Sequence, residues 1–262
     1  MMHRQWLTVT VLMLVVGVML LSPAAAQEVE PIQDDAAAIQ ILGKLNAWRM
    51  ETGAPPLKPN DTLKAMAIMQ ARYLASLPEI TGGDSMHLGP NGDTVRDRAL
   101  FPEFNWQTYG GQAAVAEVGA ASSEEWAMNF WHESDIHRET ITNPMMREVG
   151  VAAVTHQWGH VYIVVLGSRP DVLPALIDPR TNLLYLTQDM WKYGAGNVPP
   201  TQVFLFDADG RPLNGGAGQA WEPAIPIPFG AWGTMYVLYD DGISKSLTPV
   251  DLVADQIVLA VE

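Results

Sequence analysis

The sequence predicts an α+β fold in which a helix-rich first part is followed by a smaller part made of strands. Two segments near the N-terminus carry apolar side chains at helical spacing and end at glycine or proline. After Pro170 the helical periodicity disappears, prolines and glycines become frequent, and short strand-like runs follow one another. We therefore expect a boundary near residue 170, with a small immunoglobulin-like β-sandwich after it.

Helices in the first part are predicted by apolar stripes between capping and stop residues. The first runs from Asp35 to Gly53 and the second from Asn60 to Pro78. Asn60 also begins a glycosylation sequon, but we interpret it as a helix cap because its side-chain oxygen can accept a backbone hydrogen bond. Residues 81–93 are dense in turn formers and are expected to form a loop. Further helices are expected over residues 94–100 and from Ser122 or Ser123 onward.

Strands are predicted where β-branched and aromatic residues gather between turn formers. Residues 148–155 and 160–166 are expected to pair across a turn at 157–159. The glycine- and alanine-rich stretch that precedes Ala120 is ambiguous. In the second part, strands are expected at 183–187, 202–206, 235–239 and 257–261.

The N-terminal residues have the composition of an export signal. Arg4 gives a basic start, residues 6–21 are almost wholly apolar, and three alanines at 24–26 supply a small-residue cleavage site. We expect residues 1–26 to be a signal peptide that is cleaved near Ala26; the alternative is that it is retained as a membrane anchor. The acidic segment 27–35 is expected to be a flexible lead-in.

Composition limits the classes of partner and compartment. The formal net charge of −14 disfavours nucleic acid, because phosphate backbones would be repelled. The chain has no cysteine, so disulfides cannot stabilise the fold, which depends on apolar packing. For the same reason, a lipid attached to cysteine cannot anchor the protein to a membrane. These features favour a secreted or extracytoplasmic bacterial protein.

The stretch FWHESDIHR at residues 130–138 looks like a zinc-protease motif but has the wrong spacing. On one helix, His132 and His137 would point about 140° apart, because a helix turns about 100° per residue. Zinc proteases of this kind need two histidines one turn apart, with a glutamate beside them. The segment is therefore either the remnant of such a site or part of a different one.

An ordered series of short motifs runs from Leu45 to Gly167. The motifs include Leu45-Asn46, Arg49, Gly53, Pro56-Leu57, Asn60, Leu63, Ala67, Ala71, His87-Leu88-Gly89, Asn91-Gly92, Asp97-Arg98-Ala99, Glu117, Trp131, Ser134, His137-Arg138, Asn143-Pro144 and Glu148-Val149-Gly150. No single motif is diagnostic, but in their order and spacing they resemble the CAP superfamily, also called SCP-like, in its cysteine-free bacterial form.

The resemblance implies an α-β-α sandwich over residues 36–169, followed by the β-sandwich domain over residues 170–262. It also implies a ligand-binding cavity that gathers His87, His137 and Glu117. Ser134 stands where cysteine-rich members carry a second glutamate, and Glu133 is one residue away from that place. The family pattern is therefore only partly kept, with three of its four cavity groups present.

His87 and His137 are the candidate metal ligands. Two neutral imidazoles can bind a borderline cation such as Zn²⁺, and a carboxylate at Glu117 can act through a bound water. Two protein ligands leave open positions, which favours a divalent cation that is weakly held. The alternative is a polar cluster without metal that joins the 81–93 loop to the helix at Trp131.

These observations favour an exported, non-enzymatic protein whose cleft binds a small or extended ligand. The β-sandwich would serve for spacing or attachment to the cell surface. The alternatives are a metal-assisted hydrolase of peptides or cell-wall material, and an adhesive protein with a vestigial cleft. The sequence lacks a GxSxG motif and a phosphate-binding glycine loop, so no catalytic residue is assigned, although a Ser134–His137 pair is geometrically conceivable.

The remaining chemically notable residues are interpreted structurally. We expect His132 to be exposed or hydrogen-bonded on its helix, and His156 and His160 to lie on a hairpin surface. Asp207 to Gly210 begins like a calcium loop but lacks its later ligands, so a hairpin turn is expected. Core positions are expected for Trp126, Phe130 and Trp131.

Overall fold

The computed structural model describes residues 31–106, 114–169, 172–187, 200–242 and 244–260, which belong to one compact unit that starts at Pro31. The predicted signal peptide lies outside the described residues. Within them, no helix is both long enough and apolar enough to cross a membrane.

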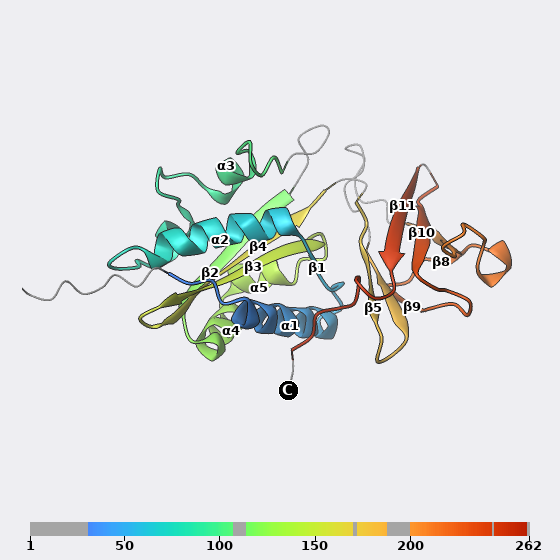
Figure 1. Ribbon diagram of the computed structural model, residues 1–262, viewed down its shortest axis with the longest axis horizontal. Coiled ribbons are helices and arrows are strands. Elements are labelled where there is room, and N and C mark those ends of the chain that lie inside the picture. The colour runs from blue at the N-terminus through green and yellow to red at the C-terminus, as the bar shows by residue number, and fades with distance from the viewer. Residues whose placement is uncertain (1–30, 107–113, 170–171, 188–199, 243, 261–262) are drawn as a thin grey trace, which may run out of the picture. The chain divides into compact units, whose positions relative to one another are not determined.

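A four-stranded sheet with the strand order β1-β3-β4-β2 forms the centre of the first part (Figure 1). β1 (Lys58–Pro59) pairs in parallel with β3, and the other neighbours are antiparallel. The strands β3 (Glu148–His156) and β4 (Gly159–Ser168) form the predicted hairpin. The ambiguous glycine- and alanine-rich stretch contains a further strand, β2 (Ala114–Ser122), which pairs with β4 along its whole length and forms the sheet edge.

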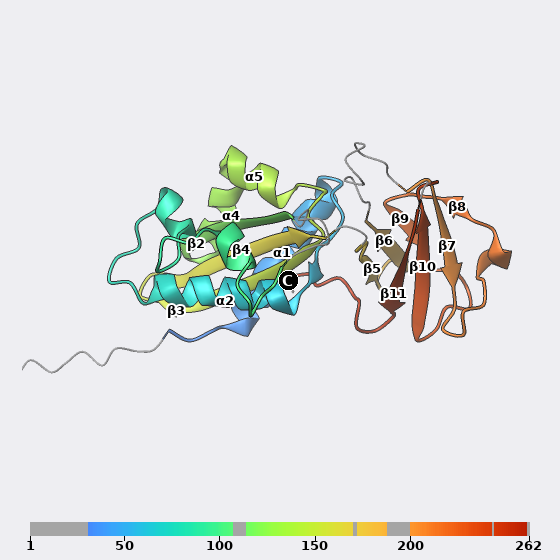
Figure 2. The same cartoon turned by 90° about the horizontal axis from the view of Figure 1, so that it is seen from above.

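Helices cover both faces of this sheet, so the observed layers are helix, sheet and helix. α1 (Asp35–Glu51) packs on one face with α4 (Glu124–Glu133) and α5 (Asp135–Ile141). α2 (Asp61–Ala75) and α3 (Val95–Ala99) pack on the other face. Figures 1 and 2 show α1 and α2 on opposite sides of the sheet. Side chains alternate along β3 and β4 between the two cores, as period-2 strand geometry requires.

Capping residues start the two long helices where the sequence predicts them. The Asn60 carboxamide oxygen accepts hydrogen bonds from the backbone N–H groups of Thr62 and Leu63. Its amide nitrogen donates to Glu148 at 2.9 Å, which ties the start of α2 to β3. Asp34 caps α1 by accepting from Ala37, and its neighbour Gln33 pairs with the end of β3, so this part of the predicted lead-in is attached to the sheet.

The prediction of one continuous helix through His132 and His137 was wrong. The helix ends at Glu133, because Ser134 adopts an extended conformation with φ −86° and ψ 117°, and a separate helix starts at Asp135. The two histidines therefore belong to different helices, and their relative direction cannot be deduced from helical spacing.

The second part contains two sheets that contribute to one apolar core, which is compatible with the predicted β-sandwich. One sheet has the order β11-β10-β7-β8, and the other has the order β5-β6-β9. The immunoglobulin-like topology and the boundary at residue 170 stay predictions. The strands are β5 (Ala175–Asp178), β6 (Leu183–Leu186), β7 (Gln202–Phe206), β8 (Gln219–Ala220), β9 (Ala224–Pro226), β10 (Thr234–Asp240) and β11 (Lys245–Asp251).

The strand predicted at residues 257–261 is absent from the described residues 257–260. This tail instead runs against α1, where the Asn46 side chain donates to the Val258 carbonyl at 3.0 Å. Val258 packs against the core beneath α1. A Cβ atom at Gly43 would collide with the backbone of Ala260, so only glycine at this helical position leaves room for the tail.

Candidate functional site

The candidate site is built around Glu117, near the middle of the edge strand β2. Its neighbours in the strand are mostly alanine and valine, and its side chain is only 1% exposed. Val115 and Ala121 pack into the core beneath α2, and Glu117 shares their face of the sheet because strand side chains alternate. A carboxylate in such a place needs partners that compensate its lost hydration.

Arg98 on α3 is the principal partner of Glu117. Its side chain is fully buried, and Nη2 donates to Glu117 Oε2 at 2.6 Å. Nη1 donates to the backbone carbonyls of His87 and Asp93 at 3.2 and 2.8 Å. One guanidinium therefore holds both the carboxylate and the loop that carries His87. The Arg98 position appears in the family motif, but the sequence reasoning assigned it no role.

His87 ends a short 3₁₀ helix, η1 (Gly83–His87), and lies beside Glu117. The distance between His87 Nδ1 and Glu117 Oε1 is 3.1 Å. Because a carboxylate accepts, Nδ1 carries the proton of the neutral ring and Nε2 keeps its lone pair. Gln70 on α2 fixes the same loop by donating to the carbonyls of Met86 and Leu88. The ring itself is 34% exposed, so His87 is oriented and still accessible.

His137 approaches from the opposite helical layer, on α5. Its Nδ1 lies 2.7 Å from Ser134 Oγ, at the extended residue that separates α4 from α5. The His137 ring also packs against Phe130, with centroids 4.8 Å apart. Both η1 and α5 contact β2, so the two histidines reach the same sheet edge from different sides.

Arg49 anchors the helix that carries His137. This buried side chain on α1 donates to the carbonyls of Ile141, Asn143 and Met146, at and beyond the end of α5. Burial lowers the pKa of Arg49 to about 9, which leaves the guanidinium charged at neutral pH. Arg49 therefore caps the end of α5, where a positive charge also complements the helix dipole.

The electrostatics favour a neutral imidazole at His137. Burial lowers its pKa below the ordinary 6.5, and the charge of His87 lowers it further. A neutral imidazole keeps the lone pair that a metal ligand needs, so the lowered pKa of His137 favours metal binding at neutral pH.

The donor set fits a loosely held cation better than a structural metal site. No hydrogen bond to Nε2 of His87 or His137 comes from the described residues. Nε2 of His87 can therefore serve as a ligand, and so can Nε2 of His137 when Ser134 Oγ accepts from its Nδ1–H. Glu117 orients His87 through one oxygen and pairs with Arg98 through the other, and its role in holding a water stays a prediction. In the part of the chain that the structure describes, no group of three or more metal-binding side chains is assembled.

Two expectations for the residues around the site need correction. Trp126 was expected in the core, but it is 50% exposed and stacks on the half-buried Phe130, with centroids 5.0 Å apart. Only Trp131 of the three aromatic residues is fully buried, and its indole N–H donates to the Gly119 carbonyl. His132 is exposed as expected and stacks on Trp48, and Glu133 is exposed at the end of α4.

The other histidines and the aspartate turn lie outside the site. His160 is more than hairpin surface, because its Nε2 lies 3.1 Å from Asp34, the cap of α1. His156 stands at the predicted hairpin turn, where its ring packs edge-on against Trp158. Asp207 forms the expected turn, since its side chain accepts from the backbone N–H groups of Asp209 and Arg211.

The lowered pKa of His137 predicts a pH dependence of stability. The unfolded chain takes up a proton at His137 at a higher pH than the folded protein does. The free energy of unfolding is therefore highest above pH 6.5 and falls as the pH is lowered through the folded-state pKa. We expect His137→Gln to reduce this decline, as measured by urea unfolding at a series of pH values.

His156 provides the comparison, because burial lowers its pKa as well. His156→Gln should remove a separate part of the decline, and the double variant should remove both parts. Asp34 contributes to the pH dependence of stability only in more acidic solution, because its pKa is lowered from 3.8. An unchanged decline in the His137→Gln variant would show that its folded-state pKa is not depressed.

Solved structures with a similar fold include the following three. An outer surface protein from Borrelia burgdorferi is 20% identical with a TM-score of 0.43, and the match covers 53% of this chain and 97% of that one. An extracellular protein with an SCP domain from Bacillus anthracis is 20% identical, with a TM-score of 0.41 and coverages of 51% and 40%. A cysteine-rich secretory protein from Staphylococcus aureus is 22% identical, with a TM-score of 0.37 and coverages of 51% and 38%.

A family model matches a segment of the first part of the chain. The model of the cysteine-rich secretory protein family, CAP, matches residues 42–166. This segment is therefore a CAP domain, as the sequence motifs predicted. A search of curated proteins found no match.

Proposed function

We propose that this chain is an exported CAP-domain protein that binds its ligand at the paired imidazoles of His87 and His137, without covalent chemistry. The proposal rests on the observation that each of the two imidazole rings is held in place by its own hydrogen-bond partner. Glu117 and Ser134 engage the Nδ1 atoms, which leaves both Nε2 atoms available to a ligand. Rings that are oriented before a ligand arrives lose little conformational entropy on binding.

The same geometry supports binding over hydrolysis. A metal-assisted hydrolase needs a base that can take a proton from the attacking water. Glu117 is the carboxylate that is hydrogen-bonded to His87, but its two oxygens already accept hydrogen bonds from His87 and Arg98. Among the described residues, no carboxylate is hydrogen-bonded to His137, so the Ser134–His137 pair lacks the oriented acid of a serine hydrolase.

A divalent cation is the simplest species that two imidazole nitrogens can bind together. His87 and His137 would hold it, and the cation would supply Lewis acidity or a bridge to an oxygen-bearing ligand. Glu117 would strengthen His87 as a ligand by accepting a hydrogen bond from its Nδ1–H group. With only two protein ligands, the binding is expected to be weak and exchangeable.

Calorimetric titration with zinc alone tests the proposal. Zinc should bind to the unmodified protein at about pH 7.5, and the heat should diminish on acidification below about pH 6.5, because protonated imidazole cannot coordinate. His87→Ala and His137→Ala should each abolish this heat. His156→Ala is the matched control, since it removes a histidine outside the site, and it should leave the titration unchanged.

Two results would count against the proposal. Equal heats from the unmodified protein and both site variants would remove His87 and His137 as ligands. Release of product from a peptide or cell-wall substrate that stops on addition of chelator would favour the hydrolase instead. Glu117→Gln would then identify the base, because it keeps the shape of the side chain and removes its basicity.

Export and surface attachment complete the proposed function. Residues 1–26 would direct export, and the residues after 170 would hold the CAP domain at the cell surface. Two of the similar solved structures are those of an outer surface protein and an extracellular protein. Mass analysis of protein recovered outside the cytoplasm should give an N-terminus at Gln27; an intact Met1 would favour the retained anchor.

A further inference from the structure

The outward face of the sheet formed by β7, β10 and β11 is apolar, although the inward face already forms the core. In an antiparallel sheet with one solvated face, polar side chains are expected to alternate with buried ones. Here the buried side chains of β10 alternate with Tyr236 and Leu238, which are half-buried. Leu247 on β11 is 58% exposed. This sheet therefore has a second apolar surface, which the inward core does not explain.

Strand register makes these residues neighbours. Tyr236 lies opposite Phe206 on one side and Pro249 on the other. Leu238 lies opposite Phe204 and Leu247. We call the set Phe206, Tyr236, Leu238 and Leu247 the outer apolar face.

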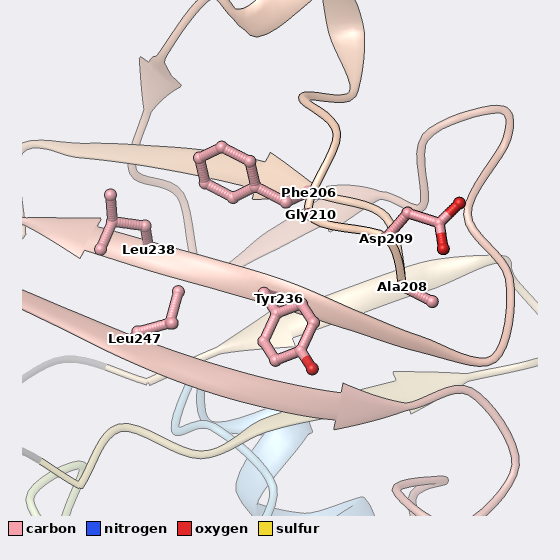
Figure 3. A pocket seen from close by; sticks show the side chains of 7 residues that line it. All are labelled: Phe206, Ala208, Asp209, Gly210, Tyr236, Leu238 and Leu247. Atoms are coloured by element: carbon pink, nitrogen blue, oxygen red, sulfur yellow. The ribbon is translucent and has the colours of Figure 1, made fainter.

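A hollow lies over the outer apolar face (Figure 3). It has a volume of about 550 Å³, and the turn at residues 208–210 lines it together with the four side chains of the face. This volume is in the usual range for small-molecule sites, which is about 300–1,000 Å³. Asp209 in the turn lines the hollow and pairs with Arg211 at 2.6 Å, so a carboxylate acceptor is available next to an apolar floor.

The size of the face argues against a second copy of this chain as its occupant. The two strands of seven residues and the one of five together span an area of about 300 Å², from a strand spacing of about 4.8 Å and a rise of about 3.4 Å per residue. A stable protein–protein interface needs about 800 Å² from each partner. The face is therefore too small for a stable dimer and fits a narrower ligand.

The surrounding chemistry also disfavours a peptide strand and a lipid. β11 is the edge strand, and Pro249 lacks the N–H group that an added strand would need. A lipid chain needs enclosure, but this site is a sheet face with one bordering turn, and burying the Asp209–Arg211 pair under hydrocarbon would be costly. The net charge of −14 disfavours anionic headgroups and acidic polysaccharides.

We propose that the outer apolar face is a binding site for a neutral glycan chain. A sugar ring has a face of C–H groups and an edge of hydroxyl groups. The C–H groups carry slight positive charge and stack on the negative faces of aromatic rings, which Tyr236 and Phe206 supply. The hydroxyl groups can donate to the carboxylate of Asp209, which lines the hollow. Such a site would give the second part of the chain a direct means of attachment to a cell surface.

Titration with cellohexaose and chitohexaose tests the proposal on the purified whole protein. At least one of these neutral oligosaccharides should bind, and Tyr236→Ala should weaken its affinity by about tenfold or more, because the main stacking surface is lost. Leu247→Ala is a second variant at an exposed position, where the fold is easily kept. Circular dichroism and the unfolding midpoint verify that each variant is folded.

Phe229→Ala is the matched control, because this fully exposed aromatic side chain lines a different hollow. It should bind the oligosaccharide as the unmodified protein does, and so should His87→Ala, which tests independence from the CAP-domain site. Failure of both oligosaccharides to bind would overturn the proposal. Binding to phosphatidylcholine vesicles, or concentration-dependent self-association, that Tyr236→Ala and Leu247→Ala abolish would overturn it in favour of a lipid or a second copy.

Discussion

Replacement of Arg98 by leucine is expected to lower the free energy of unfolding by about 3–5 kcal/mol, the usual cost of removing one partner from a buried ion pair. The Glu117 and Arg98 side chains are 1% and 0% exposed, so water cannot take the place of the guanidinium. Leucine leaves a buried carboxylate whose remaining hydrogen-bond partner, among the residues that the structure describes, is His87. Urea unfolding at neutral pH measures the loss.

The same substitution should also disturb the candidate site. Arg98 donates to the carbonyls of His87 and Asp93, and thereby connects α3 to the loop that carries His87. Without these bonds, His87 is held less firmly, so zinc affinity should fall in Arg98→Leu even at temperatures where the variant is folded. Arg98→Lys keeps the charge but loses the fork-shaped donor set, and should be intermediate in both measurements.

Arg211→Leu is the matched control for stability. Arg211 also pairs with a carboxylate at 2.6 Å, but its side chain is 74% exposed, and exposed pairs contribute about 0–1 kcal/mol. The double variant Arg98→Leu with Glu117→Leu should recover part of the loss, because it removes the unpaired charge. A loss in Arg98→Leu no larger than that in Arg211→Leu would contradict the assignment of Arg98 as the compensating charge.

The sequence contained a signal for Arg98 that was not used. Glu117 stands in the run AVAEVGAA, where every other side chain is small and apolar or absent. A carboxylate in such a strand is expected to be buried, and a buried carboxylate requires a cation. The sequence does not show which cationic residue is the partner. Arg98 is nineteen residues away on a short helix, and in the sequence nothing distinguishes it from an exposed basic residue.

The elements that the sequence predicted well are those whose stability is local. The caps at Asn60 and Ser123 and the hairpin of β3 and β4 depend on neighbouring residues, and they occur where they were expected. The tail at 257–260 has the continuous apolar composition of a buried strand, but Val258 is held by α1, a helix more than two hundred residues earlier. Trp126 is of a residue type that is common in cores, but tertiary packing decides which face of α4 is covered, and Trp126 lies on the exposed face.

Strand β11 was missed for a related reason. Its sequence, KSLTPVD, contains lysine, proline and aspartate, which are uncommon inside strands. The strand forms because it pairs with β10 over seven residues and because, at the edge of the sheet, Pro249 needs no donor on its outer side. Cross-strand pairing of this kind is not encoded in the segment itself.

Gly150→Ala is expected to destabilise the protein by an amount at or above the upper end of the range of about 1–3 kcal/mol that is typical of overpacking. Gly150 lies in β3, at the point where the strand passes the first turn of α2. An added Cβ atom would collide with the backbone of Leu63 and Lys64, which no side-chain rotation can relieve. The helix would have to move away from the sheet, and the fully buried Leu63 would lose its packing.

Gly82→Ala is the matched control, because its φ of −71° suits alanine and the space around it is open. This variant should equal or exceed the unmodified protein in stability, since alanine restricts the unfolded chain more than glycine does. The change in the free energy of unfolding, measured with urea, should be negative for Gly150→Ala and zero or positive for Gly82→Ala. Such a difference would show that the glycine in β3 is required for close packing, because glycine is otherwise unfavourable in a strand. A loss in Gly150→Ala below about 1 kcal/mol would mean that α2 does not approach β3 as closely as the structure places it.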